Sequence, residues 1–272
     1  MIRDACVQML AERTRLTLGP RPGRRGRPGA PLPARRASRL AAALALMLAS
    51  QLGARWAAAD ELQPFQASYL WYWHGAAIAL SQVRLRHRAD DTWVYGSSTH
   101  PRGIGVLYPM RPVLQSVMRV TPQSVQPLHF VATGSGRRHD ADVTFDWDSG
   151  RATGVYEGAK VDLAIHPGVQ DDMSVQIAML AQLLQGHMPE TVMEINRDSV
   201  REYDYRRAGE QLLDTALGRV DTVVYVSSHA GSPRTTSFWC APSLGYIPVQ
   251  VQQKRLNAIE WTMRIRSLQG RP

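Results

Sequence analysis

Apolar and polar residues alternate with a period of two along much of the chain beyond residue 60. Between residues 141 and 148 the odd positions are Ala, Val, Phe and Trp, whereas the even positions are Asp, Thr, Asp and Asp. Successive side chains of a β-strand point to opposite faces of a sheet, so one face of this segment is dry and the other meets water. The same alternation recurs at residues 83–86, 249–252 and 259–266. These segments are predicted to be antiparallel strands with one solvated face.

Further strands are predicted in the segments between clusters of turn residues. Gly and Pro occupy many of these gaps, as hairpin turns require. The pattern therefore indicates a mainly β protein. These additional predicted strands cover residues 66–73, 92–97, 113–120, 126–132, 154–156, 160–165, 191–196, 200–207, 211–216, 219–227 and 235–239.

One segment, residues 173–185, is predicted to be a helix. Asp171 and Asp172 precede it, and either carboxylate can cap the first turn. Gly186 follows it and can adopt the left-handed conformation that ends a helix. Apart from Gln176, its polar residues lie on one narrow side, and the rest of the circumference is Met, Val, Ile, Ala and Leu.

The breadth of this apolar surface predicts the architecture. A helix that lies on a flat sheet needs an apolar stripe of only roughly 100°, whereas this helix needs cover on most sides. An open, twisted sheet of more than about ten strands tends to curl and so acquires a concave side. We therefore expect a large curled antiparallel sheet, a spiral or half-barrel, wrapped around one central α-helix.

The excess positive charge of the chain lies before residue 60. The formal net charge is +9, from 32 basic and 23 acidic residues, but 11 Arg and only two acidic residues lie at positions 1–59. The remaining part holds 21 residues of each sign and is neutral. A neutral surface has no stripe of Lys and Arg for a phosphate backbone, which argues against a nucleic-acid partner.

The basic segment has the order of a secretory signal peptide. Arg residues precede an apolar run at residues 40–50, and Ala57, Ala58 and Ala59 follow it. Eleven apolar residues would rise about 16 Å as a helix, short of the roughly 30 Å of a bilayer core, so cleavage after about Ala59 is favoured over a retained membrane anchor. We predict a disordered or mis-annotated extension at 1–34, a signal peptide at 35–59 and a single β-rich periplasmic domain at 60–272.

Catalytic motifs are missing from the sequence. It has no Gly-x-Ser-x-Gly elbow, no phosphate-binding Gly loop, no His-Glu-x-x-His and no paired Cys motif. Cys6 lies in the predicted leader, so Cys240 is left alone and is interpreted as a buried, inert thiol. Cofactors are therefore not expected.

A metal site is not expected either. The best candidate is His139 with Asp140 and Asp142, but strand alternation places His139 on the face opposite the two carboxylates. Asp171 and Asp172 form another carboxylate pair, which is better explained by helix capping.

Two segments are candidates for ligand binding. Residues 69–73 are rich in aromatic side chains, and residues 99–110 form an apolar segment, with Gly103 and Gly105 giving it freedom, that could cover a hydrophobic ligand. The alternative is that both segments simply complete the core. The candidate ligand-binding residues are Tyr69, Trp71, Tyr108, Asp172 and Trp239.

Several short motifs in order resemble a known family. They are Phe65-x-x-x-Tyr69 followed by Gly75, Asp172-x-Ser174 at the helix start, Tyr203-x-Tyr205 with Thr215-x-x-Gly218, and Trp239-x-Ala241-Pro242 followed by Tyr246-Ile247-Pro248-Val249. Together they resemble the exported bacterial proteins grouped as domain of unknown function 3108, over most of residues 65–268. The resemblance implies a periplasmic, β-rich protein without assigned chemistry, similar in outline to other envelope proteins with spiral or half-barrel sheets, including lipoprotein carriers.

These observations favour a non-enzymatic periplasmic envelope protein. It would hold a hydrophobic or glycan-like ligand, such as a lipid, or dock to an envelope protein. The alternative is a hydrolase of envelope polymers that uses Asp171 or Asp172 with a nearby His. No transmembrane anchor is expected after cleavage.

Overall fold

The computed structural model of the chain describes residues 61–108, 110–134 and 140–270. Several sequence-based predictions fall outside these residues: the extension at 1–34, the signal peptide at 35–59 with its cleavage after Ala59, Cys6, and His139 of the candidate metal site.

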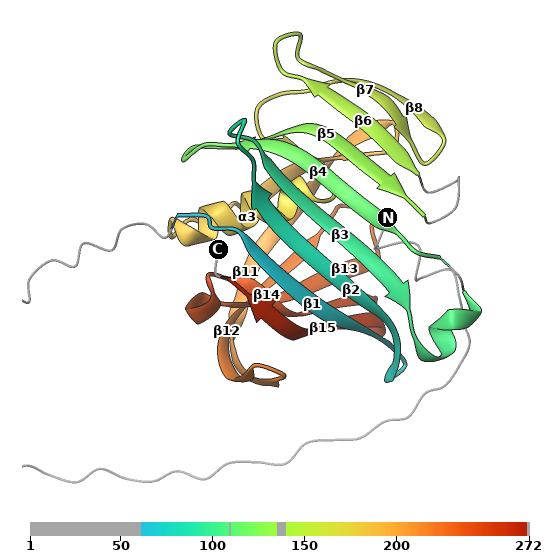
Figure 1. Cartoon of the computed structure of the whole chain (residues 1–272), viewed down its shortest axis with the longest axis vertical. Helices are drawn as coiled ribbons and strands as arrows, with labels where there is room; N and C mark the ends of the chain where they lie inside the picture. Colours follow the sequence, from blue (N-terminus) through green and yellow to red (C-terminus); the bar gives the residue numbers. More distant parts are fainter. Residues whose placement is uncertain (1–60, 109, 135–139, 271–272) are drawn as a thin grey trace, which may run out of the picture. The chain divides into compact units, whose positions relative to one another are not determined.

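The described residues form one sheet of 15 strands (Figure 1). All neighbouring strands are antiparallel except β9 and β10, which are parallel. The strands, in chain order, are β1 (Phe65–Trp73), β2 (Ala76–His87), β3 (Trp93–Pro101), β4 (Val113–Val120), β5 (Val125–Thr133), β6 (Ala141–Asp146), β7 (Arg151–Tyr156), β8 (Ala159–Ala164), β9 (Val169–Gln170), β10 (Thr191–Asn196), β11 (Ser199–Thr215), β12 (Gly218–Ser228), β13 (Arg234–Ala241), β14 (Ile247–Arg255) and β15 (Ala258–Gln269).

The sheet consists of two meanders joined at one seam. Strands β1 to β8 follow one another outward in one direction, β15 to β9 follow one another outward in the other, and β1 pairs with β15 between them. Figure 1 shows β1 in blue beside β15 in red. The sheet is curled. Its curl brings the edge strand β9 close to β5 and the other edge strand, β8, close to β11. Gln170 on β9 joins the first of these pairs by donating from Nε2 to the carbonyl of Val125, 2.8 Å away.

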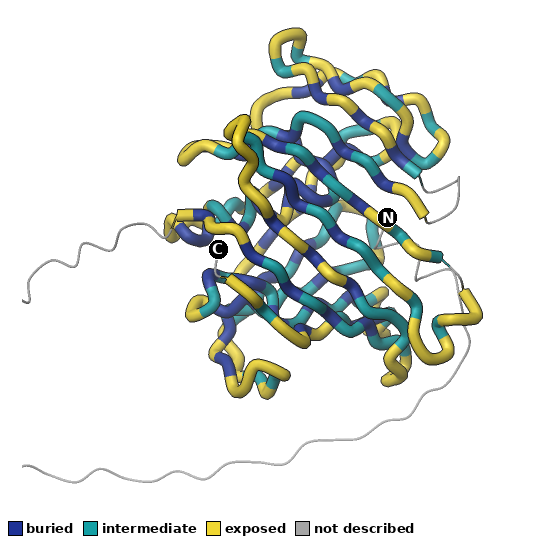
Figure 2. Tube along the Cα trace, in the orientation of Figure 1, coloured by how far each residue is buried: buried dark blue, intermediate teal, exposed yellow. Residues whose placement is uncertain are grey.

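The alternation of apolar and polar residues along the sequence predicts this architecture well. The buried and exposed residues alternate along the strands in Figure 2, and β6 has the strict in-and-out pattern expected from its sequence. The predictions of a mainly β protein with one large curled antiparallel sheet and one α-helix are confirmed for the described residues. That the sheet wraps around the helix stays a prediction at this point.

Two details of the strands differ from the sequence-based prediction. Residues 200–207 and 211–216 were expected as separate strands, but both belong to β11, whose pairing with β12 shifts register between Arg207 and Gly209. Gly209 has φ +139°, so it absorbs a bulge rather than ending the strand. Strand β9 was not predicted, because two residues are too few to show a period.

The helix α3 (Ser174–Leu184) is the one α-helix of the described chain. Of its residues only Gln176 and Gln182 are exposed. Its C-terminus ends as the sequence predicts: Gly186 has φ +76° and donates to the carbonyl of Leu183, and His187 donates to that of Gln182. These two bonds form a Schellman motif.

Two short 3-10 helices complete the fold, η1 (Gly103–Leu107) and η3 (Pro242–Leu244). The side chains of η1 are not buried, and Leu107 is 78% exposed. Gly105 was expected to give the segment conformational freedom, but its role here is to allow close packing. A Cβ on it would lie 2.0 Å from the carbonyl oxygen of Ile78 on β2. Within the described ranges, none of the helices has the length and apolar character needed to cross a bilayer.

Candidate functional site

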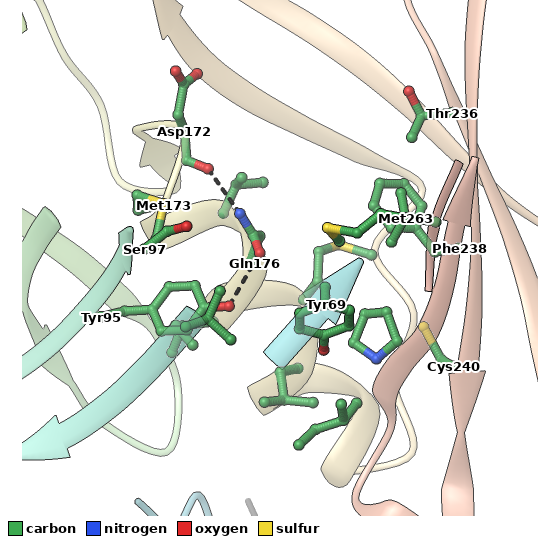
Figure 3. A pocket seen from close by; sticks show the side chains of 18 of the residues that line it. Tyr69, Tyr95, Ser97, Asp172, Met173, Gln176, Thr236, Phe238, Cys240 and Met263 are labelled. Atoms are coloured by element: carbon green, nitrogen blue, oxygen red, sulfur yellow. Dashed lines mark hydrogen bonds between the residues drawn. The ribbon is translucent and has the colours of Figure 1, made fainter. Parts of the chain in front are cut away.

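An apolar cavity of about 160 Å³ lies between α3 and the inner face of the sheet (Figure 3). Its walls come from both meanders, because strands β1 to β4 and β10 to β15 all contribute side chains. The helix supplies a further wall, with Val175, Ile177, Met179, Leu180 and Leu183. The aromatic walls are Phe65, Tyr69, Trp71, Tyr95, Tyr205, Tyr225, Phe238, Tyr246 and Trp261.

Alternation along the strands delivers these side chains to one face. On β1 the buried residues Phe65, Tyr69 and Trp71 occupy odd positions, and on β13 Thr236, Phe238 and Cys240 occupy even positions. Each set lies on one side of its strand and lines the cavity. The site is therefore built by the same period-two pattern that forms the sheet.

Hydrogen bonds satisfy some polar groups of the walls and leave one donor open. Trp71 donates from Nε1 to Oγ of Ser81 at 2.6 Å, and the Tyr95 hydroxyl donates to Oε1 of Gln176 at 3.2 Å. The Trp261 ring lies 4.8 Å from that of Trp71, centroid to centroid, yet its Nε1 is buried and has no partner among the described residues.

Three titratable groups in the walls of the cavity keep their protons. Burial raises the pKa of the Tyr69 and Tyr95 hydroxyls above the usual value and raises the pKa of the Cys240 thiol to about 12. These three groups are neutral at physiological pH. The prediction that Cys240 is buried agrees with its 5% exposure, and its raised pKa is the opposite of what a nucleophilic thiolate needs.

Asp171 caps α3. Its Oδ1 accepts hydrogen bonds from the backbone N–H groups of Met173 and Ser174, each at 2.8 Å, and its Oδ2 accepts one from the Ser116 hydroxyl of β4 at 2.6 Å. The Ser174 hydroxyl in turn lies 2.9 Å from the Asp171 backbone N–H and accepts from it, so the cap is reciprocal. Desolvation outweighs these bonds and raises the pKa of Asp171 to about 6.

Asp172 has a different position from its neighbour. Its carboxylate accepts a hydrogen bond from the Tyr156 hydroxyl of β7 at 2.7 Å, and its backbone carbonyl accepts one from Nε2 of Gln176. The residue lines the apolar cavity, and Figure 3 shows it on the far side of Gln176 from Tyr95. Capping thus belongs to Asp171, whereas Asp172 is a wall residue.

A second, polar cavity of about 70 Å³ adjoins the first, because Asp172 and Thr236 line both. Gln253 is 1% exposed and lines it; its Nε2 donates to Glu260 Oε2 at 2.8 Å, and its Oε1 is buried without a partner in the described structure. His229 lines this cavity as well. The remaining walls are Asn196, Arg201, Tyr203, Ser227, Ser228, Ser232 and Arg234.

The structure brings together three of the five residues predicted to bind a ligand. Tyr69, Trp71 and Asp172 line the apolar cavity. Trp239 does not, because it lies on the opposite side of β13 from Phe238 and donates instead to Gln211 on β11. Tyr108 follows η1 and is 46% exposed, and no described residue of the segment 99–108 lines either cavity.

Sequence reasoning missed the polar cavity. Its members lie on β10 to β14, in the turn between β12 and β13, and, for Asp172, just before α3, so they come together only through strand pairing and the curl of the sheet. Gln253 carried a usable signal, since it lies on the same side of β14 as Val249 and Val251, where an uncharged polar residue interrupts a buried row.

The candidate metal site of His139, Asp140 and Asp142 stays a prediction, because His139 lies outside the described residues. Oδ1 of Asp142 lies 2.8 Å from Nε2 of His129 on the neighbouring strand β5, and the two side chains are 73% and 43% exposed. Across the described ranges, no group of three or more His, Cys, Asp and Glu side chains is placed to hold a metal ion.

Comparison with known proteins gives the following matches. The family model described as "Protein of unknown function (DUF3108)" matches residues 66–260. A β-barrel-like protein of domain of unknown function DUF1849 from Brucella abortus is 11% identical with a TM-score of 0.46, covering 76% of this chain and 98% of that one. A proposed exported protein with a YmcC-like fold from Bacteroides fragilis is 10% identical with a TM-score of 0.34, covering 77% and 97%. No curated protein matches the chain.

Proposed function

Because the chain belongs to the DUF3108 family of proteins of unknown function, we propose its function from the cavity itself: it binds a small apolar ligand, or the apolar part of a larger one, between α3 and the sheet. The observation that carries the proposal is a cavity of about 160 Å³ with mainly aromatic and aliphatic walls. Protein interiors are close-packed, and voids larger than a water molecule are few.

The size of the cavity supports an occupant. An apolar cavity of roughly 150 Å³ is large enough to take up benzene. An unfilled apolar space leaves the side chains that line it without contact partners, which costs free energy. A ligand that fills it regains part of this free energy.

We place this activity in a periplasmic protein with three parts: the extension at 1–34, a signal peptide at 35–59 that is removed after Ala59, and a single domain at 60–272. In this proposal the sheet wraps around α3, so that the helix forms the inner wall of the ligand site. The burial of nine of its eleven residues to at least an intermediate degree supports this arrangement. The ligand class is lipid-like, and an envelope protein would deliver or receive it.

We propose that the role is binding rather than hydrolysis. A hydrolase would need an available carboxylate with a His beside it. Asp171 is engaged by three hydrogen bonds that hold the helix start, and Asp172 accepts a bond from Tyr156. Although Asp172 and His229 line the same polar cavity, the carboxylate already has a structural partner.

The test is uptake of benzene by the full chain, followed by ligand-observed NMR and by the melting temperature. At ten times its Kd a ligand stabilises the folded state by about 1.4 kcal/mol, which raises the melting temperature measurably. Ser97→Leu fills the cavity from β3 and abolishes this response. Ser98→Leu, on the other face of the same strand, keeps it.

Two results would contradict the proposal. One is the absence of any benzene response in the unsubstituted chain, and the other is an equal response in the Ser97→Leu and Ser98→Leu variants. Native mass spectrometry of protein purified gently from the periplasm gives an independent answer, since bound lipid and the mass of a chain beginning at Asp60 are both read from the same spectrum.

A further inference from the structure

The polar cavity extends the ligand site, and the inference drawn from it rests on the proposed binding function. The two cavities share Asp172 and Thr236 as walls. In Figure 3 both residues lie in the upper part of the view, Asp172 on the left and Thr236 on the right, above Tyr69 and Cys240. A ligand whose apolar part fills the apolar cavity, and which extends past Asp172 and Thr236, would therefore have its other part among the polar side chains of the second cavity.

The unpaired group of the polar cavity is an acceptor. Gln253 is 1% exposed, and its amide nitrogen is engaged by Glu260, which leaves Oε1 buried without a partner in the described residues. A buried carbonyl oxygen without a hydrogen bond is unfavourable, so an occupant that donates a hydrogen bond is selected over one that cannot.

The hydroxyl groups of the walls suit the same kind of occupant. Ser227 and Thr236 are buried at 2% and 6% exposure and line the cavity. Because a hydroxyl both donates and accepts, each can serve a ligand hydroxyl in either role. The backbone around them is strand, so these groups are held in place before a ligand arrives.

The charges around the cavity favour a neutral occupant. Arg234 lies in the wall, but its Nε donates to Oε2 of Glu260 at 3.0 Å. Asp172 lines both cavities, and Arg201 is an exposed residue of the polar one. With Arg234 paired to Glu260, the charges of Asp172 and Arg201 offset each other, so the walls offer no net charge to an anionic or a cationic group.

We infer that the ligand is an amphiphile with a neutral, hydroxyl-bearing head group. Its apolar part lies in the cavity beside α3, and its head group lies among Gln253, Thr236 and Ser227. A head-group hydroxyl donates to Oε1 of Gln253. The shared chemistry is that of a glycolipid or of another single-chain polyol.

The experiment compares amphiphiles that share one octyl chain, each titrated below its micelle concentration into the full chain. The set is n-octyl-β-D-glucoside, octanoate and octyltrimethylammonium, with benzene as the apolar reference. The expected result at pH 7 is that the glucoside binds about tenfold or more tightly than either charged compound, which corresponds to one hydrogen bond to a buried group.

Matched variants locate the head group. Gln253→Leu weakens glucoside binding about tenfold and leaves benzene binding unchanged. Gln252→Leu is the control: this residue is next on β14, has the opposite side-chain direction, and also loses one side-chain hydrogen bond, to Thr262. Thr236→Val removes a hydroxyl with little change of shape and serves if Gln253→Leu does not fold.

The outcomes separate the two proposals. If benzene does not bind, the proposed function itself fails. If benzene binds but octanoate or octyltrimethylammonium binds as tightly as the glucoside, only the head-group inference is overturned. It is also overturned if Gln253→Leu and Thr236→Val bind the glucoside as tightly as the unsubstituted chain, or if they weaken benzene and glucoside equally.

Discussion

The carboxyl group of Asp171 should make the stability of the fold depend on pH in an unusual direction. Asp171 is 1% exposed, and burial raises its pKa from 3.8 to about 6 despite three hydrogen bonds. Between these two values the folded state binds more protons than the unfolded state, so the free energy of unfolding falls as the pH rises. The stability from this group is fully present below about pH 4 and is lost by about pH 6.

The magnitude follows from the shift. About two pKa units at 1.36 kcal/mol per unit give about 3 kcal/mol. Asp171→Asn imitates the protonated carboxyl: Oδ1 still accepts from the N–H groups of Met173 and Ser174, and the Ser116 hydroxyl rotates to accept from the new amide. The Asn variant should therefore match the unsubstituted protein near pH 4 and exceed its stability by up to about 3 kcal/mol at pH 8.

The assay is urea unfolding followed by tryptophan fluorescence at several pH values between 4 and 8. Subtracting the Asn variant from the unsubstituted protein removes the contribution of the other carboxylates. Asp171→Ala is the control for capping and should be less stable than Asp171→Asn by about 1–2 kcal/mol at every pH. A difference between the unsubstituted protein and the Asn variant that does not change with pH, or an Asn variant that is less stable at pH 8, would refute the reasoning.

Two further substitutions test the packing. Leu180→Asp places a carboxylate at a position that is 5% exposed on the cavity side of α3 and should abolish cooperative folding, whereas Gln182→Asp on the exposed side should melt normally; a soluble, cooperatively melting Leu180→Asp protein would contradict burial of the helix. Gly154→Ala brings a Cβ to 2.0 Å from the carbonyl oxygen of Asp142 at φ +143° and should cost several kcal/mol, whereas Gly96→Ala meets nothing closer than 3.5 Å. Thermal melts of both Gly variants decide this, and equal stability would count against the β6–β7 pairing described.

The sequence predicts most of the strands because each carries its own signal. Where a strand faces the interior on one side and water on the other, as β6 does, the pattern of residues is sufficient. The prediction fails where strand boundaries depend on pairing with a neighbouring strand rather than on the local residue pattern. The break expected near Gly209 is a bulge in one long strand, since pairing with β12 continues on both sides of it.

The candidate site was predictable only in part, for a similar reason. Tyr69 and Trp71 lie in a segment whose aromatic density is visible in the sequence, and both line the cavity. Trp239 is also part of an aromatic segment, but its side chain lies on the face of β13 opposite the cavity. Composition alone does not say which side of a strand faces the concave side of the sheet. Gln253 joins Asp172 only through the curl of a sheet whose register is set over long distances.

The seam between the first and last strands sets the order of events in folding. Every other antiparallel neighbour pair is a hairpin of consecutive strands, whereas Gln66 pairs with Gln269 across the whole domain. Local hairpins close quickly, and contacts between distant parts of a chain close slowly. Each meander can therefore form early, but the apolar cavity is completed only when β15 pairs with β1. Until that pairing forms, the apolar inner faces of both meanders are exposed to water, and exposed apolar surface favours aggregation.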